Sequence, residues 1–181
     1  MFRDFSRAQQ RFLGLSGPLR SRPDAEAESP THVIFTPQAQ EVLLQQSYAT
    51  GSPRGGPLFG STLEGEITVV AAVPAGYPSL EPTLRYDPLR FDERYILGWS
   101  DSLTFRYGGQ VDWVGQWIMR PDGLLGSAEE HLGHLRRGNA TDLFNPRQFL
   151  ACVGWDDGDL HSLLYAYDAV RTLVGSLKTN L

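Results

Sequence analysis

From position 31 onward, apolar residues recur at spacings that alternate between those of strands and those of helices. Residues 32–35 form a short apolar run that predicts a strand. Thr36 followed by Pro37 is typical of a helix start, because a threonine side chain caps the first turn and proline fits its first position. We therefore expect a helix through about Tyr48, whose buried side is made by Val42, Leu43 and Leu44.

The middle of the chain predicts two more strands and a second helix. Residues 51–56 are expected to form a turn, and residues 57–76 two strands joined by a turn at Gly65. Residues 80–88 predict irregular structure. Apolar residues at helical spacing predict a helix over 91–106, although glycine at position 98 is a weak helix former.

The last third of the chain predicts a strand, a helix and a hairpin. A strand is expected over 111–119, and a helix over 127–137 that ends at Gly138 and Asn139. Two strands over 147–155 and 160–169 flank an acidic turn, and the final segment 170–177 fits either a strand or a helix. This order of elements predicts a three-layer α/β domain with a mixed sheet flanked by helices.

Residues 1–30 form an extension and linker that differ from the domain expected over 31–181. Arg3, Arg7 and Arg11 recur every four residues among phenylalanines, and residues 16–30 are rich in serine, proline and acidic side chains. The first 15 residues fit a short amphipathic helix that docks on a partner or membrane surface. They also fit a tail that frays or packs on its own domain.

Composition narrows the class of protein. The net charge of −5 argues against a dedicated nucleic-acid binder, which usually carries a basic excess. No apolar run approaches the roughly 20 residues needed to cross a bilayer, and the N-terminus lacks the apolar core of a secretory signal. The single cysteine, Cys152, excludes an intrachain disulfide and lies in an apolar run typical of an inert core thiol, which fits the reducing cytoplasm.

Two segments carry the most informative motifs. Gly115, Trp117 and Pro121 lie within 111–131, and the run GGPLFG occupies 55–60. Together they resemble the JAB/JAMM (MPN-domain) metalloproteases, whose signatures are G-x-W-H-S-H-P followed by S-x-x-D, and E-x-G-G-x-L-x-G. The resemblance covers roughly residues 31–168 and implies a cytidine-deaminase-like, MPN-type fold. In active members of the family the histidines hold zinc, and the glutamate activates a zinc-bound water.

The positions that matter for that chemistry are altered in this chain. Ile118 and Arg120 occupy the two histidine positions, and Pro53 occupies the position of the glutamate base. Neither an aliphatic chain nor a guanidinium can ligate zinc, so no metal and no cofactor are expected. The S-x-x-D motif aligns on Ser127 and Glu130, which would form a helix capping box, or without a gap on Ala128 and His131.

The resemblance therefore implies a catalytically inactive, JAMM-like pseudoenzyme that acts as a protein-binding or scaffolding subunit. Its partner would be an active homologue, a second copy of the chain, or a ubiquitin-like or peptide tail. If a groove remains, Ile118 would give it an apolar floor and Arg120 would engage a carboxylate. The binding candidates are Trp117, Arg120 and Asp122.

Two alternatives remain open at this point. A rebuilt metal site could draw on Glu129, Glu130, His131 and His134, although the same residues read more simply as the solvated face of a helix with Leu132 and Leu135 inward. A nucleic-acid-associated protein would use the N-terminal arginines together with Arg136 and Arg137. The acidic turn around Gly158 lacks the ligand layout of a calcium loop, and His32 and His161 are expected to be structural.

Overall fold

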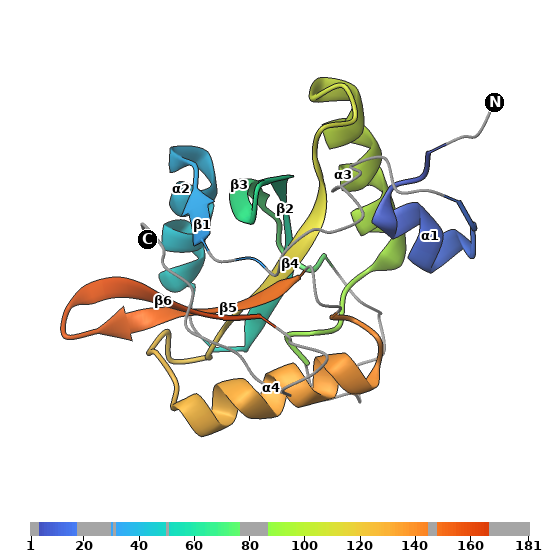
Figure 1. Cartoon of the computed structure of the whole chain (residues 1–181). Coiled ribbons are helices and arrows are strands. Elements are labelled where there is room, and N and C mark those ends of the chain that lie inside the picture. The colour runs from blue at the N-terminus through green and yellow to red at the C-terminus, as the bar shows by residue number, and fades with distance from the viewer. Residues whose placement is uncertain are drawn as a thin grey trace.

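The computed structural model describes residues 4–17, 30, 32–49, 51–76, 87–144 and 148–166. Within them the chain forms a mixed α/β domain with a six-stranded sheet and four helices (Figure 1). The expectation of a mixed sheet flanked by helices is confirmed at this level. The final segment 170–177, most of the irregular segment 80–88 and most of the linker 16–30 lie outside the described residues.

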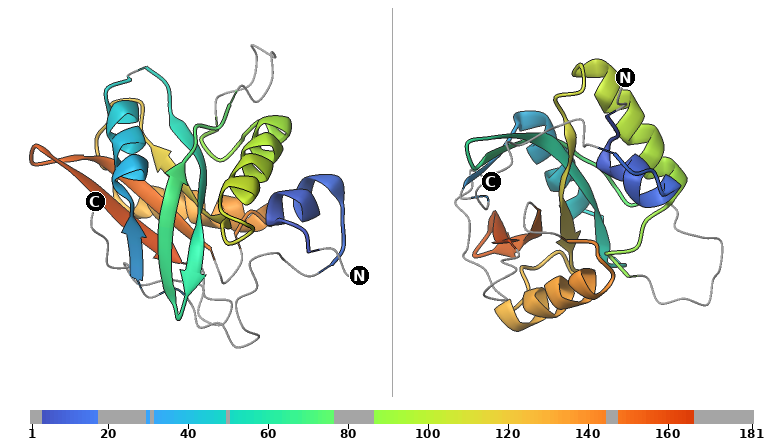
Figure 2. Two further views of the ribbon diagram at one scale, coloured as in Figure 1. Left: turned by 90° about the horizontal axis from the view of Figure 1, so that it is seen from above. Right: turned by 45° about the vertical axis from the view of Figure 1, so that its right-hand side comes forward.

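The sheet is mixed and strongly curled (Figure 2). Its order is β1-β3-β2-β4-β5-β6, with β1 parallel to β3, β4 parallel to β5, and the other pairs antiparallel. Residues of both outer strands, such as Phe35 and Leu164, share one core cluster, which follows from the curl. The strands are β1 (His32–Phe35), β2 (Arg54–Leu63), β3 (Glu66–Ala72), β4 (Asp112–Met119), β5 (Phe149–Asp156) and β6 (Asp159–Ala166).

Helix α2 (Pro37–Ser47) covers one face of this sheet (Figure 1). Thr36 caps it as predicted, since its side chain accepts a hydrogen bond from the backbone N–H of Ala39. The predicted buried side was partly wrong: Leu43 is fully buried, but Val42 is only partly buried and Leu44 is 38% exposed. The buried stripe is Ala39, Leu43 and Ser47, one residue every four, because the curled sheet contacts a narrow strip of the helix.

The other face is covered by α1 (Arg7–Leu13), α3 (Glu93–Arg106) and α4 (Ala128–Ala140), as Figure 1 shows. Since helices cover both faces, all eight residues of β4 are buried. Trp113 and Ile118 lie five positions apart yet join the same core cluster, because a β-bulge between them shifts the side-chain alternation. The bulge thus sets which face of the sheet Ile118 occupies.

Three glycines mark where the predicted boundaries were wrong. The expected turn over 51–56 ends early, and Gly55 and Gly56 lie inside β2. A Cβ on Gly55 would come within 2.2 Å of the carbonyl oxygen of Pro88, so the strand depends on a close backbone approach there. Helix α4 continues through Gly138 to Ala140, because Gly138 packs against the ring of Phe144 rather than ending the helix.

The N-terminal extension packs on the domain. The backbone N–H of Arg7 donates to the carboxylate of Asp112 at 3.0 Å, and the guanidinium of Arg11 donates to the carbonyl of Thr141 at 2.9 Å. Burial lowers the pKa of Arg7 to about 9, and its guanidinium lies 4.8 Å from the ring centroid of Trp113. Of the two roles expected for the first 15 residues, the described part, residues 4–15, fits the tail that packs on its own domain. Among the described helices, none has the length and apolar character to cross a membrane.

We predict that Phe12→Ala lowers the free energy of unfolding by about 2 kcal/mol, since the partly buried ring of Phe12 lies 5.7 Å from Phe91 and 5.8 Å from Trp113. Leu13→Ala is the matched control, because Leu13 is next in the same helix but 55% exposed, and we expect a change within about 0.5 kcal/mol. Urea unfolding of the three proteins measures both effects. Equal losses in the two variants would contradict the packing of α1 on the domain.

Candidate functional site

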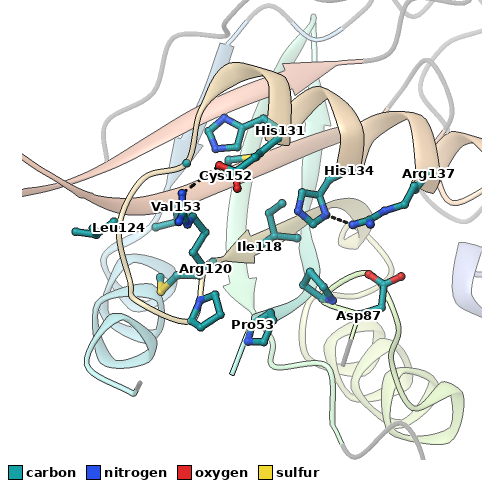
Figure 3. Close-up of a pocket in the computed structure, with 15 residues that line it drawn as sticks. Pro53, Asp87, Ile118, Arg120, Leu124, His131, His134, Arg137, Cys152 and Val153 are labelled. Atoms are coloured by element: carbon teal, nitrogen blue, oxygen red, sulfur yellow. Dashed lines mark hydrogen bonds and ion pairs between the residues drawn. The ribbon is translucent and has the colours of Figure 1, made fainter. Parts of the chain in front are cut away.

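A pocket of about 530 Å³ lies between the end of β4, the start of β2 and helix α4 (Figure 3). Three separate parts of the chain bring the candidate residues together there. Pro53 precedes β2, Ile118 and Arg120 lie at the end of β4, and Glu130 and His131 belong to α4. These five positions singled out by the resemblance therefore line one cavity, whereas Trp117 and Ser127 are not part of its lining.

Strand geometry explains why Ile118 and Arg120 share the pocket. They lie two positions apart, so their side chains leave the same face of β4. Ile118 is 5% exposed and belongs to the core beneath α4. After Arg120 the chain turns at Gly123, whose φ is 74°, and returns beside β5, where Leu124 bridges Trp155. The turn closes one end of the pocket with Leu124.

Arg120 is held by two carboxylates. Its guanidinium lies 3.1 Å from the carboxylate of Glu130 and 3.1 Å from that of Asp122, and all three side chains are about half exposed. The same Oε2 atom of Glu130 accepts the backbone N–H of Ser127 at 3.0 Å, which completes the predicted capping box. This backbone hydrogen bond, assisted by Arg120, lowers the pKa of Glu130. The charge of Arg120 is thus already balanced within the chain.

His131 corrects the prediction of a solvated helix face. Its side chain is only 3% exposed, and its Nδ1 atom lies 2.9 Å from the hydroxyl of Tyr165. Burial lowers the pKa of His131, so the imidazole is held in its neutral form. A Cβ on Gly126 would lie 2.8 Å from Oε2 of Glu130 and 3.1 Å from Nε2 of His131, so these two atoms border the same point.

His134 and Arg137 form a second polar pair at the opposite end of the pocket from Arg120 (Figure 3). Nη2 of Arg137 donates to Nδ1 of His134 at 2.7 Å. Burial, with a contribution from Arg137, lowers the pKa of His134, which keeps this nitrogen free to accept. Within the described residues no carboxylate forms an ion pair with Arg137. Asp87 lines the same end, and its Oδ1 accepts the backbone N–H of Leu89.

The remaining candidates lie elsewhere. Trp117 is fully buried on the other face of β4, where its indole donates to the carbonyl of Val73 at 3.0 Å, so it offers no surface to a partner. Asp122 is exposed and reaches the site only through Arg120. Cys152 lies in the pocket wall, and burial raises the pKa of its thiol. Glu129 is exposed on α4.

The described residues do not group three or more histidine, cysteine, aspartate or glutamate side chains in a way that could hold a metal ion. A catalytic zinc needs three protein ligands around an open position. The residues at the positions implied by the resemblance supply at most Glu130 and His131, whose atoms are engaged with Arg120, Ser127 and Tyr165. This donor set does not fit the zinc of the family.

Sequence reasoning missed the Arg137 end of the pocket. His134 and Arg137 are three residues apart on a helix, which places them on one face, and this spacing was the available signal. The contribution of Asp87 and Leu124 had no such signal, because both lie outside the regular helices and strands, and Asp87 is also distant from α4 in the sequence.

The comparisons with known proteins concern the fold alone. The sequence matches no protein-family model and no curated protein. The solution structure of protein DSY2949 from Desulfitobacterium hafniense is similar, with a TM-score of 0.53 and 14% identity over 82% of this chain and 92% of that one. A protein from Salinibacter ruber gives a TM-score of 0.45 and 20% identity over 80% of this chain and 88% of that one. The first likeness agrees with a mixed α/β fold.

We predict that His131 makes the free energy of unfolding decrease as the pH falls below neutral. Its folded-state pKa is lowered, so the unfolded chain takes up a proton first as the pH drops below about 6.5, and the folded state loses stability through that range. His131→Gln should therefore show a shallower loss of unfolding free energy between neutral and mildly acidic pH. Tyr165→Phe is the control: it keeps the burial that is the main cause and should keep the slope. An unchanged slope in His131→Gln would contradict this assignment.

Proposed function

We propose that this chain is a catalytically inactive JAB/MPN-like domain that acts as a protein-binding or scaffolding subunit. The observation that carries the proposal is the convergence of Pro53, Ile118 and Arg120 with Glu130 and His131 around one pocket. The resemblance requires this convergence, because in active members the equivalent positions surround one metal ion. These residues lie at position 53, at 118–120 and at 130–131, so the fold of the chain, and not their proximity in the sequence, brings them together.

The charges of the site support loss of hydrolysis. Glu130 stands at one of the two candidate positions for the family's carboxylate ligand, and here it pairs with the guanidinium of Arg120 at 3.1 Å. A fixed cation thus neutralises the carboxylate that a metal would otherwise neutralise. Generating hydroxide near neutral pH requires an ion with an open coordination position, and neither Arg120 nor Ile118 can help hold one.

The pocket itself suits a bound segment of another protein. Its volume of about 530 Å³ falls in the range of ligand sites, roughly 300–1,000 Å³. Its walls combine apolar side chains, including Ile118, Val153 and Leu124, with a few charged groups. An apolar wall supplies binding free energy by burying surface, and the charged groups select the partner. Cys152, the only cysteine, fits the reducing cytoplasm as the place where such a subunit works.

The N-terminal arginines fit this proposal better than a nucleic-acid role. Arg7 is buried against Trp113, and Arg11 donates to carbonyls at the end of α4. Both guanidinium groups are therefore used within the domain.

Restoring the missing ligands tests the proposal. We predict that the double variant Ile118→His, Arg120→His binds about one zinc ion per chain, because two imidazoles on one face of β4 would join Glu130, freed from its ion pair with Arg120. The unaltered protein should bind no zinc in this pocket and show no chelator-sensitive peptidase activity. Zinc content by elemental analysis and binding by calorimetry measure the difference.

The matched control is Ile118→Ala, Arg120→Ala, which removes the same side chains without adding donors and should bind no stoichiometric zinc. Thermal unfolding with and without zinc shows whether each variant is folded. A folded histidine variant that ignores zinc would argue against the family geometry. Stoichiometric zinc and peptidase activity in the unaltered chain would refute the loss of catalysis.

A further inference from the structure

We propose that the segment bound in this pocket presents a carboxylate to Arg137 and apolar side chains to Leu124, so that the pocket selects an acidic peptide in one orientation. This inference rests on the proposed binding function and adds the chemistry of the ligand. It also moves the expected anion contact from Arg120 to Arg137.

The two arginines of the pocket differ in what they can offer a ligand. Arg120 is bound by Glu130 and Asp122 at 3.1 Å each, so a ligand carboxylate would have to displace one of them. Among the described residues, Arg137 has no carboxylate ion pair, and its guanidinium donates a hydrogen bond only to the neutral imidazole of His134. A guanidinium has five N–H donors, so most of those of Arg137 remain for a ligand.

His134 fixes the direction of Arg137. The 2.7 Å hydrogen bond from Nη2 to Nδ1 holds the guanidinium beside a side chain that itself lines the pocket. An arginine held in place loses less conformational entropy when it binds a carboxylate than a freely rotating one. His134 is therefore a positioning residue for the anion contact.

Beside the ion pairs of Arg120, the opposite end of the pocket has an apolar surface that continues beyond the pocket. Leu124 is 53% exposed at the Arg120 end and forms a backbone bridge with Trp155 (Figure 3). The ring of Trp155 lies 5.9 Å from that of Tyr48, which is 69% exposed. We call Leu124, Trp155 and Tyr48 the apolar shelf. Between the shelf and Arg137, the pocket is lined by Pro53 and Ile118.

Negative charges near each end set the polarity of the ligand. Asp122 lies two residues before Leu124, and Asp156 and Asp157 follow Trp155, all of them exposed. An acidic group on the shelf would be repelled by these carboxylates. At the other end the carboxylate of Asp87 lines the pocket near Arg137 and opposes a bound anion there. Removing the charge of Asp87 should therefore strengthen anion binding.

Four short peptides test this inference on the full-length chain: Ac-Leu-Leu-Gly-Glu-NH₂, its neutral glutamine analogue, the glutamine analogue with a free C-terminal carboxylate, and the reversed sequence Ac-Glu-Gly-Leu-Leu-NH₂. Amide chemical shifts followed by NMR titration give the site and the Kd of each. We expect the peptides with a carboxylate at the C-terminal end to bind about fivefold more tightly than the neutral one. The reversed peptide should keep this advantage, because it can present the same glutamate to Arg137 and the same leucines to the shelf with its backbone running the other way. Comparing the glutamate side chain with the terminal carboxylate shows which source the pocket prefers.

Variants of single charges identify the anchor. Arg137→Gln should abolish the preference for carboxylate, whereas Arg136→Gln, next to it on the exposed side of α4 and outside the pocket lining, should keep it. Asp87→Asn should raise the affinity for the acidic peptides about twofold, since it keeps an oxygen for the N–H of Leu89 and loses the repulsion. Leu124→Ser should weaken all four peptides.

The outcomes separate this inference from the proposed function. No binding at the pocket, equal affinity for acidic and neutral peptides, or a preference that survives Arg137→Gln would overturn the inference, even if the histidine variant bound zinc. Charge-selective binding together with a histidine variant that ignores zinc would instead leave the inference standing and refute the JAB/MPN-like assignment.

Discussion

The position of the site depends on the complete burial of β4. All eight of its residues are buried, because α2 covers one face of the sheet while α1, α3 and α4 cover the other. The strand therefore ends beneath α4, where Ile118, near its end, and Arg120, just after it, line the same pocket as the first turn of that helix. A strand that was buried on one face only would deliver these side chains to open solvent. The pocket is thus a consequence of how the core is packed around one strand.

Arg120 limits the kind of chemistry that this place can support. A metal ion is a cation that can leave and that accepts lone pairs, and it activates water through an open coordination position. A guanidinium is a permanent cation that only donates hydrogen bonds. With Glu130 and Asp122 around it, Arg120 keeps the electrostatic balance of the site and also ties the end of β4 to the start of α4. These contacts therefore link two elements of the fold.

The sequence predicted those parts of the fold that depend on local interactions. The caps at Thr36 and Ser127 and the hairpin after β5 follow from residues within a few positions of one another. Parts set by distant contacts were missed. Gly55 approaches a backbone oxygen of Pro88, and His131 lies beside the hydroxyl of Tyr165. The sheet face on which Trp117 lies is also set by packing against segments far away in the chain. The candidate residues of the pocket were identified through motif positions. Helical spacing was an unused signal for the pair of His134 and Arg137, whereas the role of Leu124 required the three-dimensional arrangement.

Helix α1 has a consequence for handling this protein. Its Phe12 packs against Phe91 and Trp113, and its Ala8 is fully buried. Proteolytic loss of the first dozen residues would uncover this aromatic surface and leave the carboxylate of Asp112 without the N–H of Arg7. Such a shortened chain would expose an apolar surface patch next to the carboxylate of Asp112, and exposed apolar patches favour self-association. The start of the chain is therefore a structural part of the domain, and trimming it to improve crystals or expression would work against solubility.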